Sequence, residues 1–409
     1  MEYINRHMEE VILKLSKSWS AILLTGPRQS GKTTMLKMLS EKEGVGRKYV
    51  SLDDLSVRQI AKTDPKLFLE LYSPPVLIDE VQYAPELFTY IKIHIDGNHK
   101  PGNFWLTGSQ IFSLMCGVQE SLAGRVAILH MSPLSQREIT GSKPSPFIID
   151  FQTLLDESAR VSPVNTPDIF KRIWNGCMPG IVASDYKDRE IYYSSYLSTY
   201  IERDVRELSG AIDALKFSRF ITSAAARCSQ LVNYKAMAED ADINQIQAKE
   251  WLNILETLGI VFLLHPYSNN VLKRTIKTPK LYFYDTGIVC YLTKWSSPEV
   301  AESGAMSGAL FENFAVSEIV KGYQNSGMVP FINYYRDHDA KEIDVILEKD
   351  GALCPIEIKK TALPDKRITR TFSLIEKSPM RRGTSAVVCM TDNLSAFDRD
   401  NLIVPVWLI

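Results

Sequence analysis

The sequence predicts an α/β protein whose first part contains a parallel sheet, and two observations support this prediction. Short apolar runs bounded by turn residues alternate with stretches of helical periodicity over residues 1–140. Such runs are typical of strands buried on both faces, and helical crossovers between them favour parallel pairing. The predicted strands are Ala21–Thr25, Tyr49–Leu52, Val76–Asp79, Asn103–Thr107 and Val126–His130.

The composition is that of an ordinary globular protein. The chain has 409 residues, of which 45% are hydrophobic and 23% charged, and its length allows about two to four domains. Because the net charge is −1, a nucleic-acid partner would have to be held by a local basic patch. No apolar run approaches the roughly 18 residues of a membrane span, so no membrane contact is expected. The six cysteines form no C-x-x-C pair, and we expect a reduced cytoplasmic protein.

Changes in pattern along the chain predict four parts. Residues 1–140 form the first domain, and residues 141–230 a Ser-, Pro- and Thr-rich connector followed by a helical region. Residues 231–300 have the order helix, turn, helix, strand and hairpin, which is the spacing of a winged helix-turn-helix. The pattern of residues 301–409 predicts a helix, three strands and further α/β elements.

A phosphate-binding motif follows the first predicted strand. Residues 26–33 have the sequence GPRQSGKT, which matches G-x-x-x-x-G-K-[ST] between a strand and a helix. Glycines let backbone N–H groups wrap phosphate oxygens at the positive end of a helix. Lys32 is expected to reach the β- and γ-phosphates and Thr33 to ligate Mg²⁺. The expected nucleotide-binding residues are Gly26, Pro27, Arg28, Gln29, Ser30, Gly31, Lys32, Thr33 and Thr34.

A second motif places two carboxylates at a strand end. Val76–Asp79 is apolar up to its last residue, and Glu80 follows, as in a Walker B motif. We expect Asp79 to hold Mg²⁺ through water and Glu80 to polarise the attacking water. The predicted cofactors are therefore ATP and Mg²⁺.

Two further positions are candidates for catalysis. Ser109, just after the predicted strand Asn103–Thr107, is the preferred contact to the γ-phosphate or the attacking water, with Thr107 and Gln110 as rivals. Arg125 precedes the last strand and is a candidate arginine finger for a neighbouring subunit, which would imply a homo-oligomer. A simple turn and a surface salt bridge are the respective alternatives.

A cluster of charged residues is predicted near the C-terminus. Asp344 lies on a strand of alternating polar and apolar residues, and a Lys-Asp-Gly turn leads to the strand that carries Glu357 and Lys359. Glu357 and Lys359 are two positions apart and share a face, and Glu312 in a preceding helix can complete the group. Two carboxylates and a lysine of this kind resemble the PD-(D/E)xK nuclease core, where carboxylates hold Mg²⁺ near a phosphodiester.

Taken together, the motifs resemble a family of bacterial and archaeal AAA-type ATPases with a C-terminal region of unknown function. The resemblance rests on phrases in one order along nearly the whole chain: ILLTGPRQSGKTT, VLIDEVQYAPELF, LTGSQ, ESLAGR, TYIERDV, KLYFYDTG, EIDVILE and PIEIKK. It implies an N-terminal P-loop AAA-type ATPase domain, a middle with helical lid and winged helix, and a C-terminal restriction-endonuclease-like α/β domain. It also implies that Ser109 takes the sensor 1 position. No clear second sensor arginine follows the lid helices.

Basic segments suggest DNA or RNA as a partner. Residues 359–382 contain eight Lys or Arg and two acidic residues, and the expected wing carries Lys273, Arg274, Lys277 and Lys280. The expected recognition helix, Gln245–Leu258, is less basic, and packing between domains explains it equally well.

Three functions remain open from the sequence. The first is an ATP-driven switch that controls a nuclease-like effector acting on nucleic acid. The second is a non-cleaving regulator that binds DNA or a partner protein in an ATP-dependent way. The third, a small-molecule or nucleotide kinase, is disfavoured by the strand-end pair Asp79 and Glu80 and by the long C-terminal region.

Overall fold

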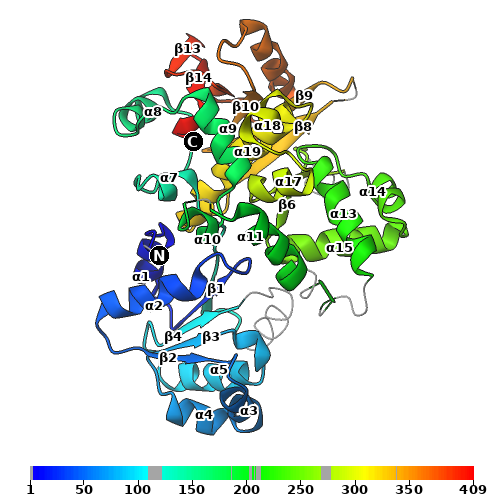
Figure 1. The fold of residues 1–409 in the computed structure, drawn as a ribbon. Coiled ribbons are helices and arrows are strands. Elements are labelled where there is room, and N and C mark those ends of the chain that lie inside the picture. The colour runs from blue at the N-terminus through cyan, green and yellow to red at the C-terminus, as the bar shows by residue number, and fades with distance from the viewer. Residues whose placement is uncertain are drawn as a thin grey trace.

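The computed structural model describes residues 3–108, 122–185, 187–201, 205–206, 208, 213–268, 278–337 and 339–409. Figure 1 shows the N-terminal sheet at one end of the molecule and the C-terminal strands at the other, with most of the helices of the middle region between them. In the part of the chain so described, no helix is both long and apolar enough to cross a membrane.

The N-terminal domain contains the predicted parallel sheet. Its strand order is β2-β3-β4-β1-β5, and every neighbouring pair is parallel. All five predicted strands are confirmed to within one residue at either end. The strands are β1 (Ala21–Thr25), β2 (Lys48–Ser51), β3 (Val76–Asp79), β4 (Phe104–Thr107) and β5 (Val126–His130).

Helices cover both faces of this sheet. Two separate buried clusters lie against it, one containing Phe68 and Phe88 and the other Met35 and Trp105. The parallel strands run in one direction, so their carboxyl ends meet at one edge, where ligands usually bind in open α/β sheets. The helices are α1 (Met8–Leu15), α2 (Lys32–Glu43), α3 (Leu55–Thr63), α4 (Pro65–Leu71), η1 (Val81–Tyr83), α5 (Leu87–Gly97) and α7 (Gln136–Ile139).

The middle region is mainly helical and contains a two-stranded antiparallel sheet, β6 (Val261–Leu264) with β7 (Lys280–Phe283). The expected order of helix, turn, helix and strand is present from α14 to β6, whereas residues 269–277 of the expected wing lie outside the described residues. The helices are α8 (Phe151–Ser158), α9 (Thr166–Asn175), α10 (Pro179–Val182), α11 (Arg189–Ser195), η2 (Tyr196–Ile201), α13 (Ala214–Ala226), α14 (Tyr234–Ala241), α15 (Gln245–Thr257), α17 (Thr286–Leu292) and α18 (Pro298–Ser303).

The Ser- and Pro-rich segment after residue 140 is more ordered than its composition suggests. It contains α8, because the Asp150 side chain accepts a hydrogen bond from the Thr153 N–H at 2.8 Å and caps the helix. Leu154 is buried and anchors one face of α8. The predicted connector therefore includes a helix that its composition did not indicate.

The C-terminal part is a mixed sheet with strand order β13-β14-β12-β10-β9-β8, to which β11 adds beside β10. Asp350 and Gly351 adopt positive φ in the turn between β9 and β10, as the sequence predicts. The elements are α19 (Ser307–Asn325), β8 (Ile332–Arg336), β9 (Glu342–Lys349), β10 (Ala352–Lys359), η3 (Lys366–Lys377), β11 (Arg381–Arg382), β12 (Ser385–Cys389), β13 (Ser395–Asp398), β14 (Asn401–Pro405) and η4 (Val406–Leu408).

The middle and C-terminal parts share one core. Most of the buried hydrophobic residues from Phe147 to Ile409 form one connected cluster, which includes Trp251 of α15 and Phe311 of α19. A smaller cluster in the same range contains Phe372. The predicted boundaries near residues 230 and 300 therefore fall within one continuous packing unit.

Candidate functional site

The loop of residues 26–31 joins β1 to α2 in a tight bend. Gly26 has a φ of 141° and Gly31 a φ of 90°, in a region that residues with a Cβ rarely adopt. A Cβ at Gly26 would lie 2.2 Å from the carbonyl oxygen of Met131, so a larger residue cannot fit without backbone movement. The bend brings the loop to the N-terminus of α2, a geometry that fits a phosphate group.

Asp79 ends β3 beside the first turn of α2. Its Oδ1 accepts hydrogen bonds from Thr33 Oγ1 at 2.7 Å and from the hydroxyl of Thr107, and its Oδ2 accepts one from the Tyr49 hydroxyl at 3.1 Å. The sequence places Thr33 and Asp79 46 residues apart, and the structure brings them into contact. Hydroxyl and carboxylate oxygens are ligands that Mg²⁺ prefers, so this pair fits the expected ion.

Glu80 follows Asp79 at the strand tip. Its φ of 56° is left-handed, which turns the chain sharply after β3. Its backbone N–H donates to Thr107 Oγ1 at 3.1 Å, and its carboxylate accepts a hydrogen bond from the Gln82 amide. The second carboxylate is thus held beside the first by a strained backbone and a side-chain contact.

Lys32 lies over the loop that it follows. Its ammonium donates to the carbonyl oxygens of Gly26 at 2.9 Å and Pro27 at 2.8 Å, and the residue is only 6% exposed. His130, at the end of β5, lies nearby. Burial and the charge of Lys32 lower the pKa of His130 to about 4, so its imidazole is neutral at neutral pH. No motif in the sequence singles out His130.

Arg6 is a second residue that sequence reasoning missed. It is buried, and its guanidinium donates to the carbonyl oxygens of Ser30 at 2.6 Å and Ser132 at 2.8 Å and to Glu138 Oε1 at 2.9 Å. Arg6 therefore fixes the phosphate loop to the segment after β5. No motif marks an arginine that lies before the first strand.

A cavity of about 480 Å³ adjoins the loop. Three segments build its wall: the N-terminal residues, the loop with the start of α2, and α10 with α11 of the helical region. The lining includes Tyr3, Arg6, Gly31, Thr34, Pro179 and Tyr192. Its volume and mixed apolar and polar wall fit a nucleoside next to the phosphate site.

The remaining predicted residues of this site have different outcomes. Thr107 is in the cluster, whereas Ser109 and Gln110 lie outside the described residues. Arg125 precedes the N-terminal end of β5, at the sheet edge opposite the loop, and forms a bidentate pair with Asp96 at 2.6 and 3.0 Å. Within this chain Arg125 makes the salt bridge that was its alternative, and an action on a neighbouring subunit stays a prediction.

Family models match three consecutive parts of the chain. Residues 18–140 match the model described as an AAA domain. This segment is an AAA-type domain. Residues 166–299 and 307–409 match two models described as domains of unknown function, DUF8612 and DUF4143. The AAA-type domain thus contains the loop, both strand-end carboxylates and His130. The charged residues predicted near the C-terminus, Glu312, Asp344, Glu357 and Lys359, lie in the part that matches DUF4143.

Two relatives that align with most of this chain carry the description uncharacterized protein. Proteins Mb2031c of Mycobacterium bovis and Rv2008c of Mycobacterium tuberculosis are each 28% identical over 357 residues, which cover 87% of this chain and 74% of each relative. Among solved structures, the Walker-type ATPase PABY2304 of Pyrococcus abyssi aligns with a TM-score of 0.42 and 13% identity over 71% of this chain and 96% of that one. A RuvB mutant of Thermotoga maritima aligns with a TM-score of 0.32 and 14% identity over 64% of this chain and 91% of that one.

The charged residues predicted near the C-terminus do come together. Lys359 Nζ on β10 lies 3.1 Å from Asp344 Oδ2 on β9 and 2.7 Å from Glu357 Oε2. Glu312 reaches the same group from α19. The antiparallel pairing of β9 with β10 places these residues on one side of the sheet.

Lys280 enters this group from β7, which the sequence did not anticipate. Its ammonium lies 3.0 Å from Glu312 Oε1 and 3.8 Å from Asp344 Oδ1, and it also contacts the Glu342 carboxylate. The expectation that Lys280 belongs to an exposed basic wing is wrong, because the residue is 3% exposed and a buried ammonium needs carboxylate partners. Lys273, Arg274 and Lys277 of that wing lie outside the described residues.

Burial and mutual repulsion shift the pKa values in the cluster. Burial and the nearby Asp344 raise the pKa of Glu357 to about 8 and that of Glu312 to about 7. Burial would also raise the pKa of Asp344, but Lys359 and Lys280 outweigh it and hold that pKa below its usual range. The cluster therefore combines one ionised carboxylate with two that retain protons readily. Across the described residues, no three His, Cys, Asp or Glu side chains are arranged to hold a metal ion.

Proposed function

We propose that this chain is a Mg²⁺-dependent ATP-hydrolysing switch whose nucleotide state controls its C-terminal domain. The observation that carries the proposal is the 2.7 Å contact between Thr33 and Asp79 at the mouth of the glycine loop. It joins the two side chains that would hold Mg²⁺, one directly and one through water. The bound ion would neutralise charge on the β- and γ-phosphates.

The chain's own groups supply the remaining roles. Lys32 exchanges its contacts with loop carbonyls for phosphate oxygens, and Glu80 orients the attacking water from the strand tip. Thr107 holds both Asp79 and the Glu80 backbone in place. Ser109, as a γ-phosphate contact, and Arg125, as a finger toward a neighbouring subunit, complete the proposed set. The nucleoside would occupy the cavity beside Arg6 and Tyr192.

Contacts from the AAA-type domain to the rest of the chain support control by nucleotide. Pro27 lies against Gly259, at the turn between α15 and β6, and the Tyr196 hydroxyl donates to the Arg28 carbonyl at 3.4 Å. The backbone N–H of Gln136 donates to Glu318 Oε2 of α19 at 2.7 Å. A change in loop position is therefore transmitted to η2 and to the turn before β6, and a change in the position of α7 is transmitted to the helix that carries Glu312.

For the C-terminal domain we favour a non-cleaving regulator, which holds a nucleic acid or a partner protein. Lys280 occupies the position between Glu312 and Asp344 where a nuclease would require a divalent ion, so the carboxylates are already neutralised. Metal-dependent cleavage is the second candidate. It is favoured by the meeting of Asp344, Glu357 and Lys359 on adjacent strands.

A paired assay tests this proposal. Phosphate release and cleavage of single- and double-stranded DNA and RNA are measured on the same samples of wild type, Lys32→Ala and Glu357→Ala. We expect Lys32→Ala to abolish hydrolysis and Glu357→Ala to leave it largely intact, with no cleavage in Mg²⁺ or Mn²⁺. Absence of Mg²⁺-dependent nucleotide affinity in wild type would refute the switch, and cleavage that is lost in Glu357→Ala would establish the second candidate.

A further inference from the structure

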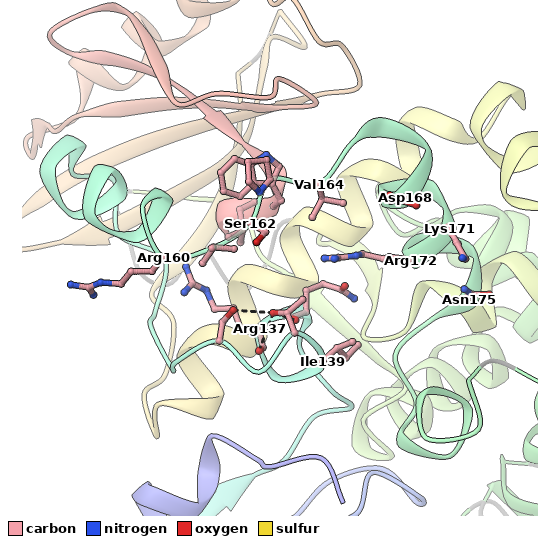
Figure 2. A pocket seen from close by; sticks show the side chains of 16 residues that line it. Arg137, Ile139, Arg160, Ser162, Val164, Asp168, Lys171, Arg172 and Asn175 are labelled. Atoms are coloured by element: carbon pink, nitrogen blue, oxygen red, sulfur yellow. Dashed lines mark hydrogen bonds between the residues drawn. The ribbon is translucent and has the colours of Figure 1, made fainter. Parts of the chain in front are cut away.

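A second cavity, also of about 480 Å³, lies between α7 of the AAA-type domain and the residues that follow β14 of the C-terminal sheet (Figure 2). Its walls are α7 with the residues that follow it, the 160–164 segment, α9, and residues 407 and 409. It is separate from the nucleotide cavity, with which it shares no lining residue. None of the roles proposed above uses it.

The side chains around this cavity are mainly cationic. Arg137, Arg160, Lys171 and Arg172 line it, against one acidic residue, Asp168. In Figure 2 the Arg172 side chain extends from α9 toward the side where Arg137 lies, whereas Arg160 points outward at the rim. Arg137 also pairs with Glu157 at 2.7 Å, so the side chains retain a net positive charge. Such a concave basic surface concentrates anions.

Polar atoms in the wall lack hydrogen-bond partners. Arg137 and Gln136 are each 8% exposed, and Arg137 Nε and Gln136 Oε1 have no partner although both atoms are buried. Trp407 Nε1 is a third such atom in the same lining. Unpaired buried groups each cost about 1–3 kcal/mol. Because these three atoms are shielded from solvent, a ligand in the cavity pairs them and recovers that free energy only if the wall shifts. Two of the three atoms are donors and one is an acceptor.

Both main walls lead directly to the nucleotide site. On α7, Gln136 and Arg137 face this cavity, and the adjacent Glu138 holds Arg6, which donates to Ser30 of the phosphate loop. The chain of α9 continues through Cys177 to Pro179, which lines the nucleotide cavity. A ligand that shifts α7 or α9 would therefore move contacts of bound nucleotide.

We propose that this cavity binds a small hydroxylated polyanion and that its occupancy changes nucleotide affinity. Two donors and four cations select phosphate or carboxylate groups, and Gln136 Oε1 selects a hydroxyl donor on the same molecule. Sugar phosphates and hydroxylated polycarboxylates share this chemistry. The binding site stands on its own geometry, whereas the coupling to nucleotide rests on the proposed function.

Binding is tested by calorimetry on full-length Lys32→Ala protein, in which the phosphate loop is disabled. Ribose 5-phosphate and citrate are titrated separately, without Mg²⁺, to distinguish a phosphate from a carboxylate ligand. We expect at least one to bind and the added pair Lys171→Gln and Arg172→Gln to weaken it at least tenfold. The matched pair Lys62→Gln and Lys66→Gln, on exposed positions of α3 and α4, should leave binding unchanged.

Two results would overturn the site: no heat from either probe at millimolar concentration, or equal binding after the Lys171 and Arg172 changes in protein that melts like its parent. Coupling is tested on wild type by measuring ATP affinity with and without the probe that binds. We expect a change of at least threefold, and an unchanged affinity would overturn the coupling. If wild type bound no ATP, the proposed function would fail, and the calorimetric result would still decide the polyanion site.

Discussion

The two acidic clusters of this chain hold their carboxylates in opposite ways. At the strand tip of the AAA-type domain, Asp79 accepts hydrogen bonds from the hydroxyls of Thr33, Tyr49 and Thr107. In the C-terminal domain, Asp344 lies between the ammonium groups of Lys280 and Lys359. Hydroxyls leave the negative charge available to a cation, whereas ammonium groups neutralise it.

This difference shows why the presence of acidic residues alone does not define a metal site. A carboxylate held by hydroxyls gains a large electrostatic interaction when Mg²⁺ arrives, and the same hydroxyls serve as further oxygen ligands. A carboxylate already paired with two lysines must give up those pairs first. Four substitutions test this contrast, and they follow in order of decreasing expected effect.

Lys280→Met should have the largest effect on stability. It leaves Glu312, Glu342 and Asp344 without their shared ammonium, and breaking a buried pair of this kind costs about 3–5 kcal/mol of unfolding free energy. Thermal melts should also show that Mn²⁺ stabilises the variant more than the wild type, because both proteins retain the site at Thr33 and Asp79. If Mn²⁺ raised the melting temperature of both proteins equally, the idea that Lys280 replaces a metal would be wrong.

Asp79→Asn should lower the rate constant for ATP hydrolysis by about 100-fold or more, because it removes the charge that retains Mg²⁺. Phosphate release measured across a Mg²⁺ titration checks this expectation. Tyr49→Phe is the matched control. It deletes one hydrogen bond to the other carboxylate oxygen and should change the rate by less than about tenfold. Similar losses in both variants would argue against a metal role for Asp79.

Glu357→Gln should flatten the pH dependence of stability. The pKa of Glu357 rises from 4.5 to about 8 on folding, so the folded state binds the extra proton between these values. Its contribution to stability is full below pH 4.5 and is lost as the pH rises toward 8. Melting temperatures of wild type should fall across this window more steeply than those of the variant. The exposed Glu41→Gln should behave like wild type, and parallel curves for all three would contradict the shift.

Gly259→Ala should give the smallest effect, about 1–2 kcal/mol from the left-handed backbone plus a contribution from crowding. A Cβ at Gly259 would lie 3.0 Å from Pro27 Cδ and 3.2 Å from His130 Cε1. Gly44→Ala has nearly the same φ but meets nothing within 4 Å, so it isolates the backbone contribution. Gly259→Ala should lower the free energy of unfolding, measured by denaturant melts, and the affinity for ATP more than Gly44→Ala does. Equal values for the two variants would show that this contact does not affect the loop.

The sequence predicted the parts of the molecule that local patterns determine. Apolar runs located the five strands of the AAA-type sheet, and the glycine motif located the loop. The Asp350–Gly351 turn followed from the preference of these residues for positive φ. The contact of Asp79 with Thr33 was predictable because carboxyl ends of parallel strands meet at one edge.

Contacts between distant, isolated residues were not predictable in this way. Arg6 meets Glu138 across 132 positions, and neither residue lies in a motif. Lys280 was assigned to a basic hairpin because its neighbours in sequence are basic, yet its partners come from α19 and β9. Pairing of buried charges depends on which elements pack together, and a single sequence carries little information about that packing.

The large hydrophobic cluster that extends from Phe147 to Ile409 has a consequence for how the molecule unfolds. Segments that share a core lose it together, so the lid helices, the β6–β7 hairpin and the C-terminal sheet should unfold as one cooperative block. Differential scanning calorimetry would then record two endotherms, one for the AAA-type domain and one for this block. A fragment that ends near residue 300 would lack Phe311 and its neighbours and would aggregate instead of folding.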